Sequence, residues 1–268
     1  MSASARLLLR AVALAYLALL LIVPVGMMLW HALENGLSPL WSSLVEPDAL
    51  HALWLTLEVA AIVVPLNTVF GVLFALALVR HRFPGAWLAN AVLDLPFAVS
   101  PVIAGFTLVL VYGTQGWFGQ WLLDHGLQVI FATPGIVLAT IFVSLPFVAR
   151  EVIPVLREIG SEQEEAAATL GAGSLQRFWR ITLPAIRWAV VYGVVLTTAR
   201  AIGEYGAVAV VGGRVIGQTQ TLTLRVESSY ENFDRAGAYV AALELAVIAL
   251  GTLFLMNLVN PHRKDSRR

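Results

Sequence analysis

Charged residues inside apolar stretches are the first candidates for chemistry in this sequence. Arg200, Glu204 and Glu244 lie within long apolar runs, and Glu58 lies near the end of another. A charge at the centre of a bilayer costs about 2.5–3.5 kcal/mol on insertion scales, so such residues usually face a partner or a solute pathway. Glu204 follows Arg200 by one helical turn, which places both side chains on one face. Arg200 therefore attracts an anion, belongs to a gate opened by rearranging an ion pair, or forms a static pair with Glu204 or Glu244.

Catalytic and metal-binding groups do not accompany these charges. The chain has no cysteine, and its histidines are scattered without metal-ligand spacing: His31, His51, His81, His125 and His262. A P-loop needs a lysine on the phosphates of ATP, and the only lysine is Lys264 in the tail. The sequence therefore predicts no cofactor, no metal site and no enzymatic activity, so any ATP hydrolysis would belong to a separate polypeptide.

Composition indicates the solvent in which these residues lie. Of 268 residues, 59% are hydrophobic and 13% are charged, and the mean hydropathy is +0.80. Soluble domains carry about a quarter charged residues, so this chain has too little polar surface to cover a globule in water. Its net charge of zero provides no basic field for nucleic acid. The composition predicts an integral protein in contact with membrane lipid.

Six apolar stretches are long enough to span a bilayer, for which about 20 residues are needed. They cover about Ala11–Trp30, Leu53–Val79, Leu95–Tyr112, Pro134–Arg150, Trp188–Val211 and Tyr239–Val259. The expected fold class is therefore all-α and transmembrane, with about six helices in a single domain over residues 1–268.

Basic residues predict the orientation, because they concentrate in cytoplasmic segments. Three of the 17 lie in the segment 213–238 on one side, and Arg200 lies inside a span. The others lie on the opposite side: Arg6, Arg10, Arg80, Arg82, Arg150, Arg157, Arg177, Arg180, Arg187, Arg263, Lys264, Arg267 and Arg268. Both termini and the loop before the fifth span should therefore be cytoplasmic.

That loop, residues 157–187, has helical patterning of its own. Ser161 and Glu164 have the spacing of a capping box, and Ala166–Ala168 have the highest helix propensity. Glycines at 171 and 173 should end this first short helix. A second should begin at Ser174 and run through Arg180. Leu183-Pro184 should then end the loop, because the residue before proline is disfavoured in helical geometry. The pattern predicts a rigid protrusion rather than a linker.

A helix lying on the membrane surface is the plain alternative for this segment. Such an anchor should carry a row of large apolar side chains. The first predicted helix offers only Ala166–Ala168 and Leu170. Small side chains let the backbone of a partner approach closely, so the composition favours a protein socket over lipid.

The loop resembles the permease subunits of binding-protein-dependent ABC importers. Their pattern is EAA, three residues, G, nine residues, I, one residue, LP, and the loop matches it at Glu165, Ala166, Ala167, Gly171, Ile181, Leu183 and Pro184. The resemblance implies the type I ABC importer permease fold. It also implies that residues 157–187, termed the EAA loop, carry the coupling helix that docks on a cytoplasmic ATPase.

A narrower resemblance covers the fifth span and the segment after it. The run 199–208 and the residues 217–227 are similar to the W-type permease subunit of sulfate/thiosulfate importers. This similarity is clearest over residues 157–244. It implies an inner-membrane complex with two ATP-binding subunits, a second permease chain of T type and an external sulfate-binding protein. Permeases for molybdate or tungstate are closely related and remain the alternative substrate class.

Two other classes of membrane protein fit part of the pattern. A secondary transporter or channel would also suit kinked spans with intramembrane charges, but it usually shows internal repeats and has no use for an EAA loop. A membrane enzyme would need converging catalytic residues, and the four intramembrane charges have no Ser/His/Asp or metal constellation beside them. The sequence favours the ABC permease over both.

Overall fold

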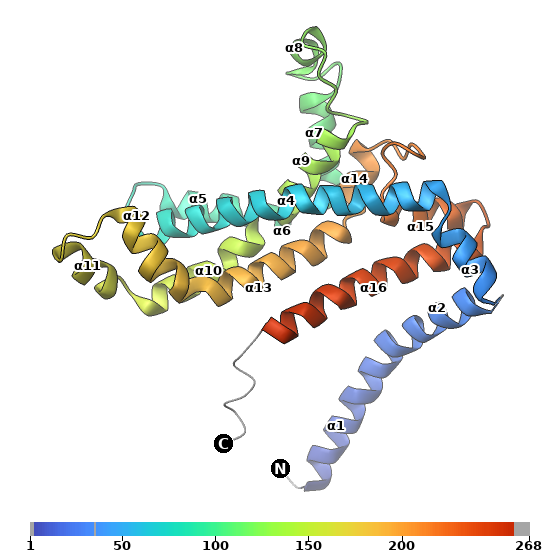
Figure 1. The fold of residues 1–268 in the computed structure, drawn as a ribbon, viewed down its shortest axis with the longest axis horizontal. Coiled ribbons are helices and arrows are strands. Elements are labelled where there is room, and N and C mark those ends of the chain that lie inside the picture. Colours follow the sequence, from blue (N-terminus) through green and yellow to red (C-terminus); the bar gives the residue numbers. More distant parts are fainter. Residues whose placement is uncertain (1–2, 35, 260–268) are drawn as a thin grey trace.

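The computed structural model describes residues 3–34 and 36–259, and the regular elements in those ranges are all helices (Figure 1). The first half contains α1 (Ala3–Leu17), η1 (Ala18–Ile22), α2 (Val23–Leu33), α3 (Leu37–Leu44), α4 (Pro47–Arg80), α5 (Ala86–Leu93), α6 (Leu95–Ala98), α7 (Pro101–Tyr112) and α8 (Gly119–Asp124). The second half contains α9 (Thr133–Ser144), α10 (Pro146–Ile159), α11 (Glu162–Thr169), α12 (Ser174–Arg177), η2 (Phe178–Thr182), α13 (Leu183–Ile202), α14 (Gly206–Val211), α15 (Leu222–Glu231) and α16 (Arg235–Val259).

The long apolar helices of the structure agree with the predicted all-α transmembrane class. Among the described residues, five helical stretches have the length and hydropathy to cross a membrane, and α7 is a shorter apolar helix of 12 residues. The third predicted span is therefore divided, because Val99 is extended between α6 and α7. Pro101 occupies the first turn of α7, where its missing N–H costs no helical hydrogen bond.

The fifth predicted span is also interrupted. Its first part, α13, begins upstream of the expected Trp188 and ends at Ile202. Residues 203–205 leave the helix, and α14 then carries the chain to Val211. The prediction of one helix over 188–211 was wrong, because a buried carboxylate in the interruption starts α14 anew.

Three helices pack closely around Val148 of α10. A Cβ added to Gly71 of α4 would lie 2.7 Å from Val148 Cβ, and one added to Gly193 of α13 would lie 2.7 Å from Val148 Cα. Small residues at such points let helix backbones approach, which is how helices associate in lipid. The surrounding cluster includes Ile153 and Ile186, so α4, α10 and α13 form one packed unit.

A second buried region connects this unit to α9, α14 and α15. Ile136 of α9, Ala201 of α13 and Leu224 of α15 belong to one buried cluster. Ala207 and Val211 of α14 pack in a neighbouring cluster with α9. As Figure 1 shows, α7, α8 and α9 stand away from the row formed by α4, α10, α13 and α16.

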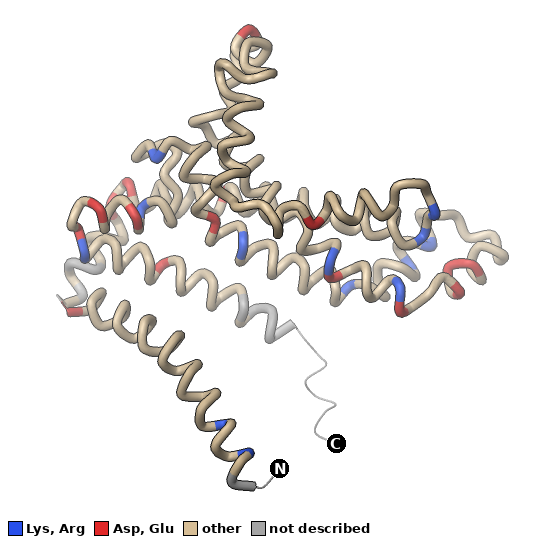
Figure 2. The backbone as a smooth tube through the Cα atoms, turned by 180° about the vertical axis from the view of Figure 1, so that it is seen from behind, with Lys and Arg blue, Asp and Glu red and all other residues tan. Residues whose placement is uncertain are grey.

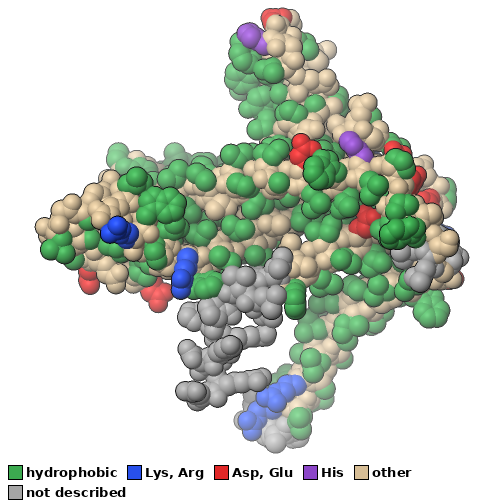
Figure 3. Space-filling model, in the orientation of Figure 1, with side chains coloured by type: hydrophobic (Ala, Val, Ile, Leu, Met, Phe, Trp, Pro, Cys, Tyr) green, Lys and Arg blue, Asp and Glu red, His purple; other side chains and the backbone are tan. Residues whose placement is uncertain are grey.

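The N-terminal arm, α1 to α2, extends away from the body (Figure 1). None of the 18-residue apolar window in Ala5–Leu33 is buried within the chain. Hydrophobic side chains also cover much of the remaining surface in Figure 3. Large exposed apolar area of this extent marks contact with lipid or with other protein.

The charges are distributed asymmetrically, as the orientation rule requires. Figure 2 shows Lys and Arg near the start of α1 and around the end of the molecule that carries α11 and α12. Arg80 at the end of α4 and Arg157 at the end of α10 lie at that same end. The EAA loop thus belongs to the basic side of the fold.

The contact at Val148 can be tested with Gly193→Val, compared with Gly251→Val as the control. The added side chain at 193 meets the α10 backbone, whereas a Cβ at 251 meets nothing within 4 Å. Overpacking of this kind costs about 1–3 kcal/mol, so the Gly193 variant should melt several degrees lower in detergent. Equal melting temperatures for the two variants would contradict the close packing of α10 and α13.

Candidate functional site

The EAA loop contains the predicted short helix. This helix, α11, starts two residues after Gly160 and is followed by Gly171, and both glycines have positive φ, of 64° and 86°. The left-handed region is open to glycine and strained for other residues. A Cβ at Gly171 would meet nothing within 4 Å, so backbone conformation rather than space requires glycine there. The elbow between α11 and α12 therefore has a fixed direction.

The first half of the EAA motif faces away from the protein. Glu165, Ala166 and Gly171 are exposed and Ala167 is half-buried, and α11, whose side chains are all described, buries none of them. Leu170, beside the motif, is 88% exposed. An exposed leucine among alanines and glycines presents a small apolar surface without large side chains that would keep a partner at a distance.

The second half of the motif lies against the membrane helices. Ile181 and Leu183 are half-buried, and Leu183 packs on the cluster formed by α4, α10 and α13. Pro184 is exposed in the first turn of α13. The motif therefore joins an outward-facing helix to an element anchored in the core.

The capping box predicted at the start of α11 is not formed. Ser161 Oγ donates to Glu165 Oε1 at 2.5 Å instead of serving the backbone. Its φ of −110° and ψ of −3° differ from the extended geometry that an N-cap side chain requires. The Glu164 carboxylate is bound by Arg80 of α4, with 3.0 Å between Arg80 Nε and Glu164 Oε2. A tertiary ion pair has replaced the local contact.

Leu183-Pro184 does not end a helix, contrary to expectation. Leu183 has helical angles, φ −62° and ψ −44°, and α12 continues through η2 into α13. The π-helical turn η2 spans residues 178–182 and ends two residues before the proline. Such a turn shifts the hydrogen-bond register, which accommodates a residue without an N–H inside a helical run. The EAA loop is consequently continuous with the fifth span.

Arg200 and Glu204 form an ion pair at the interruption of the fifth span. Arg200 Nη1 lies 2.6 Å from Glu204 Oε2, and the Glu204 side chain is 1% exposed. Glu204 Oε1 also accepts from the Ala207 N–H at 2.8 Å, at the start of α14. The backbone carbonyl of Glu204 accepts from Thr223 Oγ1 at 2.8 Å. Glu204 therefore has a structural function as the cap of α14, besides neutralising Arg200.

The Arg200 side chain is less enclosed than its partner. It is 31% exposed and lines a cavity of about 420 Å³ with residues 96–101, Val143 and Phe147. The cavity lies at the break between α6 and α7, so irregular backbone borders it. Non-helical backbone at membrane depth is tolerated where it lines a cavity. Arg200 thus combines a static ion pair with access to an open space.

The other two intramembrane carboxylates lie apart from this pair. Glu244 of α16 is half-buried, and its Oε2 is enclosed without a hydrogen-bond partner among the described residues. The ion pair of Arg200 is formed with Glu204 and not with Glu244. Glu58 is exposed on α4. The structure therefore brings Arg200 and Glu204 together and leaves Glu244 and Glu58 outside that site.

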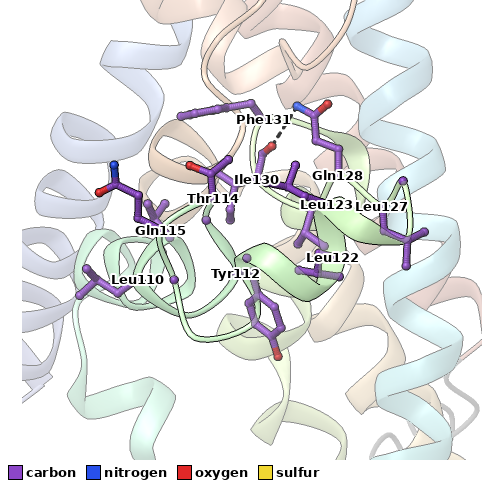
Figure 4. Close-up of a pocket in the computed structure, with 16 residues that line it drawn as sticks. Leu110, Tyr112, Thr114, Gln115, Leu122, Leu123, Leu127, Gln128, Ile130 and Phe131 are labelled. Atoms are coloured by element: carbon purple, nitrogen blue, oxygen red, sulfur yellow. Dashed lines mark hydrogen bonds between the residues drawn. The ribbon is translucent and has the colours of Figure 1, made fainter.

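A larger cavity, of about 740 Å³, lies between the end of α7, α8 and the segment that connects α8 to α9. Figure 4 shows its lining, in which Tyr112, Leu122 and Ile130 accompany the polar side chains of Thr114, Gln115 and Gln128. Gln128 Nε2 donates to Ile130 O at 3.2 Å. None of the described residues that line the cavity is charged, so it lacks the cation that recognition of an anion usually uses.

Sequence reasoning missed the ionic contacts at the basic side of the fold. Arg80 binds Glu164, and Arg150 binds Asp94, with 2.8 Å between Arg150 Nε and Asp94 Oδ1. Arg80 ends α4 whereas Arg150 lies within α10, and both partners lie in distant segments. The sequence signal was an acidic residue on the basic side, which identifies candidates for pairing without identifying the partners.

Comparison with known families decides the class of this protein. The family model described as "Binding-protein-dependent transport system inner membrane component" matches residues 68–265, which is more than half of the chain. The chain belongs to this family. It is an inner-membrane component of a binding-protein-dependent transport system. The predictions of a membrane transport subunit without catalytic activity, and of its localisation, are confirmed.

Individual relatives cover most of the chain. The sulfate transport system permease protein CysW of Synechocystis sp. is 52% identical over 94% of this chain and 91% of its own length. The CysW of Escherichia coli K12 is 49% identical over 90% and 83%. The corresponding CysT of Synechococcus elongatus is 38% identical over 90% and 87%.

A solved structure has the same fold. A chain of a bacterial alginate ABC transporter, in complex with an alginate pentasaccharide-bound periplasmic protein, superposes with a TM-score of 0.78 at 18% identity. The match covers 98% of this chain and 96% of that chain. The predicted ABC importer permease fold is thereby confirmed.

The structural function of Glu204 can be tested with Glu204→Gln, with Glu231→Gln as a matched control at an exposed position of α15. Loss of the Glu204 charge leaves Arg200 without its partner and weakens the cap of α14. We expect a destabilisation of roughly 1–3 kcal/mol, since Arg200 is partly exposed and the full cost of a broken buried pair does not apply. Thermal unfolding in detergent measures it, and equal stability of the two variants would contradict this function.

Proposed function

We propose that this chain is the W-type permease subunit of an ATP-driven sulfate importer. The relatives whose names specify a W-type sulfate permease share 49–52% identity with it, against 38–40% for those named T-type. Identity at this level over nine-tenths or more of the chain supports the same cargo as well as the same fold. The proposal depends on this similarity together with the EAA loop, whose helix α11 buries none of its residues.

The whole chain, residues 1–268, acts as one membrane domain in this proposal, and residues 157–187 are its coupling segment. ATP binding closes two ATPase subunits, which moves the two docked α11 helices and switches the permease pair between inward-facing and outward-facing states. The exposure of Glu165, Ala166 and Gly171 supports docking, because a partner has free access to them. The anchoring of Leu183 in the core supports transmission to the spans.

The proposed complex contains two ATP-binding subunits, a T-type permease chain and an external sulfate-binding protein. The similarity of the chain to both W-type and T-type permeases supports a pseudo-symmetric pair of related subunits. Thiosulfate has the same charge and tetrahedral shape as sulfate and belongs to the same cargo class. The names of the relatives above support sulfate over molybdate and tungstate.

Arg200 is proposed to contact the anion on its way through the membrane. Its guanidinium borders the cavity at residues 96–101, where a planar fork of donors suits a tetrahedral oxyanion. Glu204 keeps the net charge of the pair near zero, so the anion would be held weakly and released readily. We assign Glu244 to the same pathway because its carboxylate is enclosed without a hydrogen-bond partner among the described residues. A rearrangement of α16 would change the surroundings of this carboxylate.

The proposal is tested by expressing the chain with candidate ATPase, T-type and binding-protein subunits and reconstituting the complex in liposomes. Uptake of radiolabelled sulfate should require ATP and the binding protein. Competition by unlabelled thiosulfate should be strong and competition by molybdate weak. ATP-dependent molybdate uptake without sulfate uptake would contradict the proposed substrate.

Coupling through α11 predicts a specific effect of Gly171→Val. Valine at φ 86° is strained by about 1–2 kcal/mol, which redirects the elbow although the side chain itself meets open space. The variant should insert into the membrane at a normal level but lose sulfate uptake and co-purification of the ATPase.

Gly173→Val provides the matched control for this experiment. Gly173 has φ −67°, and a Cβ added there would meet nothing within 4 Å, so valine fits without strain. Its uptake should resemble that of the unmodified chain. Normal uptake by Gly171→Val would count against the coupling function of the loop.

The pathway function predicts that Arg200→Ala lowers sulfate uptake by about tenfold, the factor expected for loss of one charge-assisted hydrogen bond. Binding of the ATPase should be unchanged, because Arg200 lies far along α13 from the EAA loop. Arg200→Lys, which retains the charge, should keep part of the uptake. Loss of the assembled complex in Arg200→Ala would instead assign the residue to packing alone.

A further inference from the structure

Arg80, the last residue of α4, contacts the end of α10 and the start of α11, which lie 76 to 84 positions later in the chain. Its Nη1 donates to the carbonyl of Leu156 at 3.1 Å, and its Nη2 donates to the carbonyl of Gly160 at 2.7 Å. Both carbonyls lie at the C-terminal end of α10, where helical carbonyls lack intrahelical partners. Its Nε and Nη2 bind the two carboxylate oxygens of Glu164 at 3.0 and 3.1 Å. The guanidinium thus connects α4, α10 and α11.

Glu164 completes the connection from the side of the EAA loop. Its Oε1 also accepts from Thr182 Oγ1 at 2.9 Å, and Thr182 is 3% exposed at the end of η2. Its backbone carbonyl accepts from Arg177 Nη1 of α12 at 3.5 Å. The side chains of Arg80 and Glu164 are 14% and 17% exposed, so the pair is largely shielded from solvent and from screening by salt.

This attachment matters because α11 has no hydrophobic anchor. It buries none of its residues, whereas α10 and α13 on either side of the loop contribute to the core. Glu162 and Glu165 of the same first turn are exposed, and Glu165 bonds Ser161 within the loop. The bidentate pair with Arg80 is therefore the strongest described contact between α11 and the membrane helices, since a forked arginine–carboxylate contact resists both sliding and rotation.

We propose that Arg80 and Glu164 are positioning residues that transmit displacement of α11 to α4 and α10. The inference rests on the proposed docking of α11 to an ATPase. The ends of α4 and α10 and the start of the fifth span meet at one ion pair, so a movement of α11 carries all three together. Without the pair, the ATPase still binds the exposed face of α11, but its motion is absorbed by the loop.

The test uses the complete transporter reconstituted in liposomes with its binding protein. Arg80→Gln, Glu164→Gln and the double variant are compared with Glu231→Gln, a control at an exposed carboxylate of α15, outside the EAA loop. ATPase co-purification, ATP hydrolysis and uptake of radiolabelled sulfate are measured on the same assembled preparations, so misfolded material is excluded. The quantity compared is sulfate transported per ATP hydrolysed.

Each single variant should assemble with the ATPase and retain hydrolysis while sulfate transported per ATP falls by about tenfold, the factor expected for a charge-assisted contact. The double variant should be no worse than either single variant, because both substitutions remove one shared interaction. Glu231→Gln should behave as the unmodified chain.

Three results would overturn the proposal. Normal transport per ATP in the single variants, losses that multiply in the double variant, or loss of ATPase binding in both would each remove the transmission function. A failure of the underlying docking proposal is distinguishable, because the ATPase would then fail to co-purify with the unmodified chain as well. Glu164→Asp, which keeps the charge, should recover part of the coupling.

Discussion

Charged groups among apolar helices must be neutralised within the protein, since lipid offers them neither water nor counter-ions. The Arg200–Glu204 pair satisfies this constraint and shapes the fold at the same time. By accepting the Ala207 N–H, the Glu204 carboxylate starts a new helix, α14, in the middle of an apolar run. The interruption of the fifth span follows from that buried carboxylate, and the guanidinium that it neutralises borders the cavity at the break between α6 and α7.

The same constraint acts at the basic end of the molecule. Arg80 at the end of α4 and Arg150 within α10 each bind an acidic residue of a connecting segment. The α11 segment is thereby fixed to the helices by directional contacts rather than by burial, whereas the segment around Asp94 also buries Leu93 and Pro96. This has a functional consequence for α11. Because the helix buries no residue, its exposed face stays free for a partner, while Glu164 in its first turn holds it to Arg80.

Much of this organisation was predictable from local sequence. Apolar length indicated the spans, arginine distribution indicated the basic side, and the spacing from Glu165 to Pro184 identified the loop that the family pattern describes. The glycine at 171 was predictable as a helix stop, and its positive φ explains why. These signals are local, since they depend on composition or on neighbours within a few helical turns.

The failures have a common physical cause, which is competition from distant partners. Ser161 and Glu164 have the spacing of a capping box, but an arginine 84 positions away binds the glutamate more strongly. Leu183-Pro184 reads as a stop, yet the π-turn before it lets the helix continue. The break in the fifth span had a local signal in Gly203-Glu204, but its cap on α14 depends on burial, which sequence does not show.

The central claim is that α11 is the surface on which the ATPase acts, and site-directed cross-linking tests it most directly. The chain contains no cysteine, so Ala166→Cys introduces a single reactive thiol on the exposed face of α11. A short bifunctional reagent applied to the assembled transporter should join this thiol to the ATP-binding subunit, with a yield that changes when ATP is added. Trp117→Cys, at a side chain that is 88% exposed near the start of α8, should give no such product. Cross-linking of position 166 to lipid alone, with the ATPase present and active, would contradict the account.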